Sequence, residues 1–99
     1  MGEKIYVDTS LGYEIELNTI LDFIGKDSPI NALNFAKKLE EKVNNLPHFP
    51  YKCRRSIKSN DENIRDLIFS GYVIPYRINT EKNRIEVLGI FGENEWEMS

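Results

Sequence analysis

Apolar and polar residues alternate through three consecutive runs in the C-terminal half of the chain, and turn residues separate the runs. The runs are Ile64–Phe69, Tyr72–Ile78 and Ile85–Phe91, with breaks at Ser70-Gly71 and at Asn79–Asn83. A period of two places successive side chains on opposite faces of a strand. Short breaks with glycine or asparagine are typical of hairpin turns. The pattern therefore predicts an antiparallel meander of three strands.

The N-terminal half has a helical period after a short opening strand expected over Lys4–Asp8. Apolar residues recur every three or four positions from about Tyr13 to Ile24, which predicts a helix that stops at Gly25. A second helix is expected from Pro29 to Leu46. The positions expected to face the core are Tyr13, Leu17, Ile20, Leu21 and Ile24 in the first helix and Ala32, Leu33, Ala36, Leu39, Val43 and Leu46 in the second.

Residues with capping and breaking chemistry mark the ends of these helices. Thr9 and Ser10 precede the first helix, and Ser28 precedes the second, where a hydroxyl oxygen accepts hydrogen bonds from free N–H groups. Pro29 stands at the first helical position, where its missing N–H costs nothing, and Pro47 closes the second helix. The two helices are therefore predicted with defined starting points.

The opening strand, the two helices and the meander give the order β-α-α-β-β-β, and a further strand is expected over Arg54–Lys58, before the meander. Both helices must lie on one face of the sheet in order to bury their apolar stripes. Pro75 interrupts the run Tyr72–Ile78 and, because it lacks an N–H, requires an edge position or a bulge. The sequence predicts an α+β, two-layer sandwich in which two N-terminal helices pack on a mainly antiparallel sheet, as one domain over residues 1–99.

Composition agrees with a folded domain. The 99 residues are 40% hydrophobic and 29% charged, which is too apolar for a disordered chain. No apolar run approaches the roughly 18 residues that span a bilayer, and the first residues lack the apolar region of a signal peptide, so the cytoplasm is the expected location. With one cysteine and one histidine, neither a disulfide nor a metal site rich in these residues is expected, and no cofactor is indicated.

Charge is unevenly distributed, although the net charge is −3. A negative net charge argues against a protein whose main task is to bind nucleic acid through phosphates. The segment Lys52–Lys58 nevertheless holds a basic run without an acid, whereas Glu93–Glu97 is acidic around Trp96. We therefore expect a basic and an acidic region on the surface, and the tail could fold over the basic residues.

Short motifs spread over nearly the whole chain carry a family resemblance, and they are Ser10, Ser28-Pro29, Ala32, Phe35, Leu46-Pro47 with Pro50, Arg54, Ile64–Ile68, Gly71-Tyr72, Tyr76-Arg77-Ile78 and Ile85–Ile90. In this order and spacing the chain resembles the RelE/ParE toxin superfamily, and the meander is most similar to the ParE branch. The resemblance implies a toxin of a bacterial type II toxin–antitoxin (plasmid stabilisation, or addiction) system. It also implies a small cognate antitoxin that wraps the sheet and helices in a hetero-oligomer.

The two branches of this superfamily imply different activities. ParE-like members poison DNA gyrase by binding it, whereas RelE-like members cleave messenger RNA on the ribosome. The chain carries Cys53-Arg54 where many members carry glycine and arginine, and after Tyr76 it has no tyrosine or histidine of the kind that the ribosome-dependent nucleases use. Trp96 is neither an acid nor a base. The gyrase-binding alternative is therefore favoured, with no enzymatic activity expected, and a non-toxic interaction module is a third alternative.

RNA cleavage would need a base, an acid and cations for the charge that builds on the phosphate. The candidates for the cations are Arg54, Lys58, Arg65 and Arg77. The base would have to be a lysine, His48, Glu93 or Glu95. If the chain acts by binding instead, the candidate contact residues are Lys52, Arg54, Arg55, Arg65, Tyr76, Arg77 and Trp96.

These candidates also have structural interpretations. The basic run could be a solvated strand edge that discourages pairing with other chains. Arg65, in a strand expected to be central, could form a salt bridge with Glu86 or with the acidic tail. Trp96 could dock on the sheet of its own chain, and His48, between a proline and a phenylalanine, fits a turn.

Overall fold

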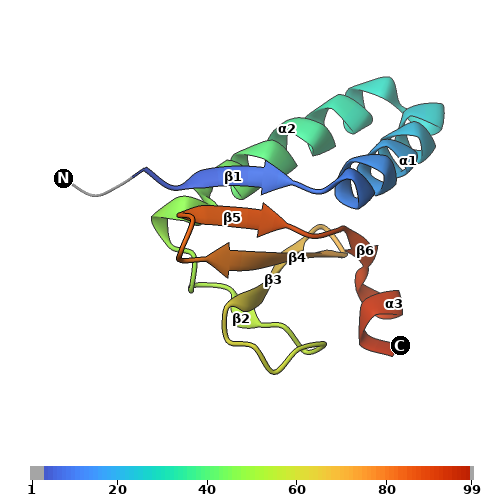
Figure 1. Cartoon of the computed structure of the whole chain (residues 1–99). Coiled ribbons are helices and arrows are strands. Elements are labelled where there is room, and N and C mark those ends of the chain that lie inside the picture. The colour runs from blue at the N-terminus through green and yellow to red at the C-terminus, as the bar shows by residue number, and fades with distance from the viewer. Residues whose placement is uncertain (1–3, 99) are drawn as a thin grey trace.

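In the computed structural model, which describes residues 4–98, helices pack on a mixed six-stranded sheet (Figure 1). The strands lie in the order β1-β5-β4-β3-β2, with β6 beside β4; β1 and β5 are parallel and the other pairs are antiparallel. None of the helices in this part of the chain is long and apolar enough to cross a membrane. The elements are β1 (Tyr6–Thr9), α1 (Leu11–Asp27), α2 (Pro29–Asn45), the 3-10 helix η1 (Leu46–His48), β2 (Arg54–Arg55), β3 (Ile64–Phe69), β4 (Tyr72–Asn79), β5 (Arg84–Val87), β6 (Phe91–Gly92) and α3 (Glu93–Met98).

The predicted α+β architecture is confirmed, and the structure extends the predicted element order. The short strand β6 and the helix α3 are additions, whereas β2 is the strand expected before the meander. The strand expected over Arg54–Lys58 covers only Arg54–Arg55. The pairing of β2 with β3 ends at Ser56, whose N donates to Ile64 O at 2.9 Å. The Ser56 hydroxyl accepts from Lys58 N at 3.3 Å, and this turn leads the chain away from β3.

Two serine hydroxyls cap the long helices as predicted. Ser10 Oγ accepts from Tyr13 N at 3.0 Å, and Ser28 Oγ accepts from Asn31 N at 3.1 Å. The expected stop at Gly25 is wrong, because Ser28 N still donates to Ile24 O at 3.0 Å and α1 therefore continues to Asp27. Gly25 is an ordinary helical residue that lies beside α2.

Replacing Ser28 with alanine is expected to lower the free energy of unfolding by about 1 kcal/mol, since the first turn of α2 loses its cap. For a chain of this size the midpoint of thermal unfolding should fall by roughly 4–8 °C. Thr19→Ala is the control, because Thr19 is an exposed residue inside α1 where alanine is a better helix former. An equal loss in both variants would contradict a capping role.

The core lies between the two long helices and one face of the sheet. Phe35 of α2 packs edge-on against Phe69 and Tyr72, with ring centroids 5.2 and 5.6 Å apart. Leu33 was expected in this layer but is 56% exposed, because it lies on the flank of α2 beside the row that contacts the core. The buried members of the core are Tyr13, Leu39, Val43, Leu46, Leu67, Ile74, Tyr76, Ile78, Ile85, Val87 and Ile90.

The β3–β4 hairpin closes through a two-residue turn. Ser70 has φ 48° and Gly71 has φ 82°, and Phe69 pairs with Tyr72 directly outside them. Positive φ at both central residues matches the right-handed twist of the flanking strands. The predicted meander is confirmed, although the last expected strand, Ile85–Phe91, is divided into β5 and β6.

Pro75 explains where that last strand divides. Of the two expected alternatives, an edge position is wrong, because β4 lies inside the sheet between β3 and β5. The ladder bulges at this point instead, since Leu88–Ile90, three residues, lie opposite the two residues Ile74 and Pro75. Pro75 stands where β5 has ended, and Leu88 N donates to Pro75 O at 2.8 Å. Proline cannot return a hydrogen bond to Leu88, and the hydroxyl of Ser10 donates to Leu88 O at 2.9 Å in its place.

Candidate functional site

The candidate basic residues lie on both faces of the sheet. Arg54 pairs with Asp66 in the register and Arg55 with Arg65. Side chains alternate along a strand, so Arg65 faces the helices and Arg54 the opposite side. Arg77 is also on the side opposite the helices, where its Nη1 lies 3.7 Å from Glu86 Oε1. These arginines therefore do not converge on one site.

Arg65 is held by backbone carbonyls rather than by an acid. Its Nε donates to Glu62 O at 2.8 Å, and its Nη1 donates to Cys53 O at 3.1 Å. The guanidinium also lies 5.1 Å from the centre of the Tyr51 ring. The expected salt bridge with Glu86 or the tail is therefore wrong. The tertiary structure brings the loop carbonyls within reach, and Arg65 ties together the loops on both sides of β2.

Tyr76 is a core residue. It is 0% exposed, and its hydroxyl donates to Pro50 O at 2.6 Å. Two effects raise the pKa of this hydroxyl well above its usual value: burial is the larger, and a hydrogen bond with the side chain of Cys53 is the smaller. Tyr76 therefore contacts no partner in this conformation and does not supply a base. It holds the loop that follows α2 against the sheet.

Asp66 is the residue that sequence reasoning missed. It is 1% exposed, and its Oδ2 accepts from Trp96 Nε1 at 3.1 Å and lies 3.5 Å from Arg54 Nη2. Its Oδ1 is buried and accepts no hydrogen bond from residues 4–98. The available signal was its position on the same face of the strand as Ile64 and Ile68, because an acid in an apolar row requires a partner.

The C-terminal helix docks on its own chain, as predicted for Trp96. The Trp96 ring stacks on Phe91 with centroids 5.0 Å apart, and Lys58 Nζ lies 5.6 Å from the centre of the Trp96 ring. Because Trp96 binds Asp66, α3 lies on the sheet face opposite the helices. Of the two arginines that the tail could cover, Arg54 lies on the same face as Trp96 and contacts the same Asp66 oxygen, whereas Arg65 faces the other way.

A groove crosses the edge of the sheet beside β3 and encloses about 560 Å³. We call it the edge groove. Of the candidate contact residues, it includes Lys52 and Arg54, whereas Arg55, Arg65, Tyr76, Arg77 and Trp96 lie outside it. The residues that line it are Lys42, Asn45, Leu46, His48, Phe49, Lys52, Cys53, Arg54, Asp66, Leu67 and Ile68.

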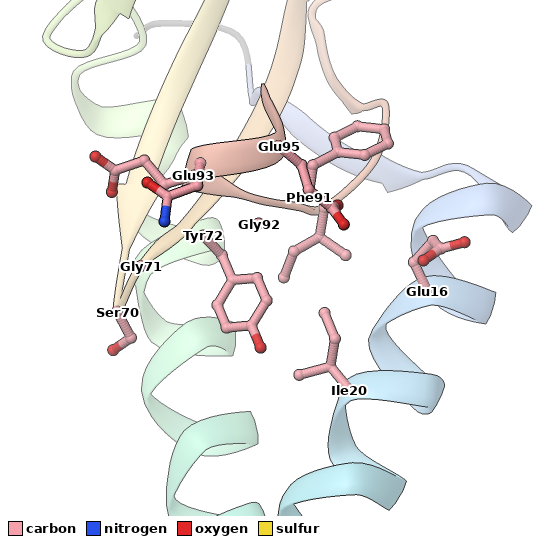
Figure 2. Close-up of a pocket in the computed structure, with 11 residues that line it drawn as sticks. Glu16, Ile20, Ser70, Gly71, Tyr72, Phe91, Gly92, Glu93 and Glu95 are labelled. Atoms are coloured by element: carbon pink, nitrogen blue, oxygen red, sulfur yellow. The ribbon is translucent and has the colours of Figure 1, made fainter. Parts of the chain in front are cut away.

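A second pocket, of about 680 Å³, lies between α1, the β3–β4 turn and the C-terminal segment (Figure 2). Ile20 and Tyr72 point toward its centre, and the carboxylates of Glu16, Glu93 and Glu95 surround it. It shares no lining residue with the edge groove. The two carboxylates considered as nuclease bases, Glu93 and Glu95, thus lie in a different pocket from Lys52 and Arg54. Within residues 4–98, no cluster of histidine, cysteine and acidic residues could hold a metal ion.

Comparison with known proteins gives one family. The sequence model for the ParE toxin of the type II toxin–antitoxin system, parDE, matches residues 13–95. No curated protein matches the chain. A solved structure described as the chromosomal ParDE TA system from P. aeruginosa contains a chain that is 19% identical, with a TM-score of 0.70. The match covers 89% of this chain and 95% of that one, and it shows a shared fold.

Proposed function

We propose that this chain, which belongs to the ParE toxin family of type II toxin–antitoxin systems, acts in the cytoplasm by binding DNA gyrase and is neutralised by a cognate antitoxin. One observation carries the choice of binding over RNA cleavage. The three candidate arginines, Arg54, Arg65 and Arg77, lie on both faces of the sheet and are engaged within the chain, instead of converging around one phosphate.

The requirements of RNA cleavage make this observation informative. A nuclease needs a base near the attacking hydroxyl and cations near the same phosphate. Here Arg54 lies beside Asp66, Arg77 beside Glu86, and Arg65 donates to loop carbonyls on the other face. A protein-binding role requires no such convergence.

Exposed apolar side chains on the helical hairpin support a protein partner. Large apolar patches on a small protein commonly mark interaction surfaces. These residues all lie on α1 or α2 and are between 55% and 71% exposed: Leu11, Ile15, Phe23, Ile30 and Leu33. We propose that gyrase or the antitoxin covers exposed apolar side chains of this helical hairpin.

Pulse labelling after induction of the chain in bacteria tests the proposal. Incorporation of labelled thymidine should fall before that of labelled methionine, because a gyrase poison stops DNA synthesis first. Purified chain should also inhibit supercoiling by purified gyrase. If methionine incorporation falls first, the chain is a RelE-like ribosome-dependent nuclease and the proposal is wrong. If neither falls, the chain is not toxic and serves as an interaction module.

Arg77→Ala is the matched variant for this experiment. Arg77 is exposed and its ion pair with Glu86 is long, so the fold should be retained. The gyrase proposal predicts that Arg77→Ala still blocks thymidine incorporation first. A nuclease that used Arg77 for its phosphate would lose its effect on methionine incorporation in the same variant.

A further inference from the structure

β1 lies at the end of the sheet opposite to β2, and one side of its backbone is unpaired (Figure 1). Tyr6 N donates to Asn83 O at 3.0 Å, so Tyr6 directs its backbone groups toward β5. The neighbouring residues of an extended chain, Ile5 and Val7, direct theirs away from the sheet. Within residues 4–98, these outward groups form no backbone hydrogen bond. The sheet is therefore open along β1.

An unpaired strand edge is a template for pairing with another chain, and natural proteins protect such edges with a proline, a bulge or charged side chains. From Tyr6 opposite Arg84 to Thr9 opposite Val87, β1 contains no proline and pairs with β5 without a bulge. Tyr6 is 54% exposed and adds apolar area beside the edge. Charge is therefore the feature that decides which strand can pair with β1.

The charges along this edge are complementary to themselves. Lys4 and Asp8 stand two residues before and two residues after Tyr6, on the same face of the extended chain. A second copy that pairs antiparallel, with Tyr6 opposite Tyr6, places each Lys4 opposite the Asp8 of the other copy. The same register brings Ile5 opposite Val7, and the outward backbone groups of these two residues form the paired hydrogen bonds. Opposite charges in directly opposed pairs are favourable, whereas a parallel pair in register would oppose like charges.

The contacts that Lys4 and Asp8 make within the chain leave both side chains accessible. Asp8 forms an ion pair with Arg84, but its side chain is 49% exposed and that of Arg84 43%. A carboxylate accepts about four hydrogen bonds, so Asp8 can bind a lysine in addition. Lys4 Nζ lies 5.5 Å from the centre of the Tyr6 ring, above the exposed face of the edge. Both charges are thus placed beside the line where a second copy would pair.

We propose that two copies of this chain associate through β1, antiparallel and centred on Tyr6, so that their two sheets become one continuous sheet. The interface is isologous, because every contact is made twice across the twofold axis. β1 is short and an interface of this size is weak, so the chain should be a monomer at low concentration and a dimer at high concentration. The edge groove lies at the other end of the sheet and stays open in this dimer.

Charge reversal tests the register. Lys4→Glu and Asp8→Lys each oppose like charges twice in the dimer, so each variant alone should raise the dissociation constant at least about tenfold. An equimolar mixture of the two variants should dimerise again, because every opposed pair then joins unlike charges. Sedimentation equilibrium between about 10 μM and 1 mM measures the mass, in the range expected for a weak interface. A native chain that stays monomeric throughout this range, or a mixture that does not recover the dimer, would show the proposal to be wrong.

A cysteine at the twofold axis tests the geometry. In a chain that also carries Cys53→Ala, Tyr6→Cys should form a disulfide between two copies, because opposed Cα atoms of a non-hydrogen-bonded pair are about 4.5 Å apart. Thr9→Cys is the control, since it lies on the same strand but about 20 Å from its counterpart in this register. Equal cross-linking of the two variants, or none with Tyr6→Cys, would overturn the proposal. Neither measurement involves gyrase or an antitoxin, so the result stands apart from the proposed function.

Discussion

Tyr76→Ala is expected to lower the free energy of unfolding by about 3–5 kcal/mol, the range for removing a large aromatic side chain from a core. Tyr76 is 0% exposed, and its hydroxyl holds Pro50, so the variant leaves a cavity and releases the loop after α2. Domains of this size are stable by only about 5–15 kcal/mol, so part of the variant should be unfolded under growth conditions. Urea denaturation followed by circular dichroism measures the loss.

Tyr76→Phe is the matched control. It keeps the ring and removes only the hydrogen bond to Pro50 O, which should lower stability by about 1 kcal/mol. If Tyr76→Ala left stability unchanged but abolished partner binding, Tyr76 would be a contact residue and its assignment to the core would be wrong.

The pH dependence provides an independent check on the same residue. Burial raises the pKa of Tyr76, so the folded state resists its ionisation while the unfolded chain ionises near its usual pKa of about 10. The stability associated with the protonated hydroxyl is therefore fully present below about pH 10 and is lost progressively at higher pH. Tyr76→Phe should therefore lose less stability than the native chain between neutral and strongly alkaline pH.

Asp66→Ala is expected to lower the free energy of unfolding by about 2–3 kcal/mol and to release α3 from the sheet. The variant leaves Trp96 Nε1 without its acceptor and removes the acid beside Arg54. Because Arg54 is partly exposed and can be solvated, we expect less than the full loss for a buried ion pair. The fluorescence of Trp96, the one tryptophan, should shift to longer wavelength as its ring enters water.

Asp8→Ala is the control for Asp66→Ala. Asp8 also pairs with an arginine, Arg84, but both side chains are exposed, so we expect little change in stability and no change in fluorescence. A large change in the Asp8 variant, or an unchanged Trp96 signal in the Asp66 variant, would contradict the role given to Asp66 as the anchor of α3.

Local patterns in the sequence determined most of the secondary structure. The alternation in Ile64–Phe69 and Tyr72–Ile78, with Ser70-Gly71 between them, predicted a hairpin that the structure contains. Ser10 and Ser28 predicted the starts of the helices, since a cap acts on backbone groups two or three residues away. These predictions succeeded because the interactions involved connect residues that are close in the chain.

Only the tertiary structure decided the candidate site. The environment of Asp66 depends on Trp96, and one carbonyl partner of Arg65, Cys53 O, comes from the loop that Tyr76 holds in place. The sequence singled out Lys52 and Arg54 by charge, but not the groove that they line. Such contacts join residues far apart in the chain, and a pattern of neighbouring residues carries no information about which distant groups meet.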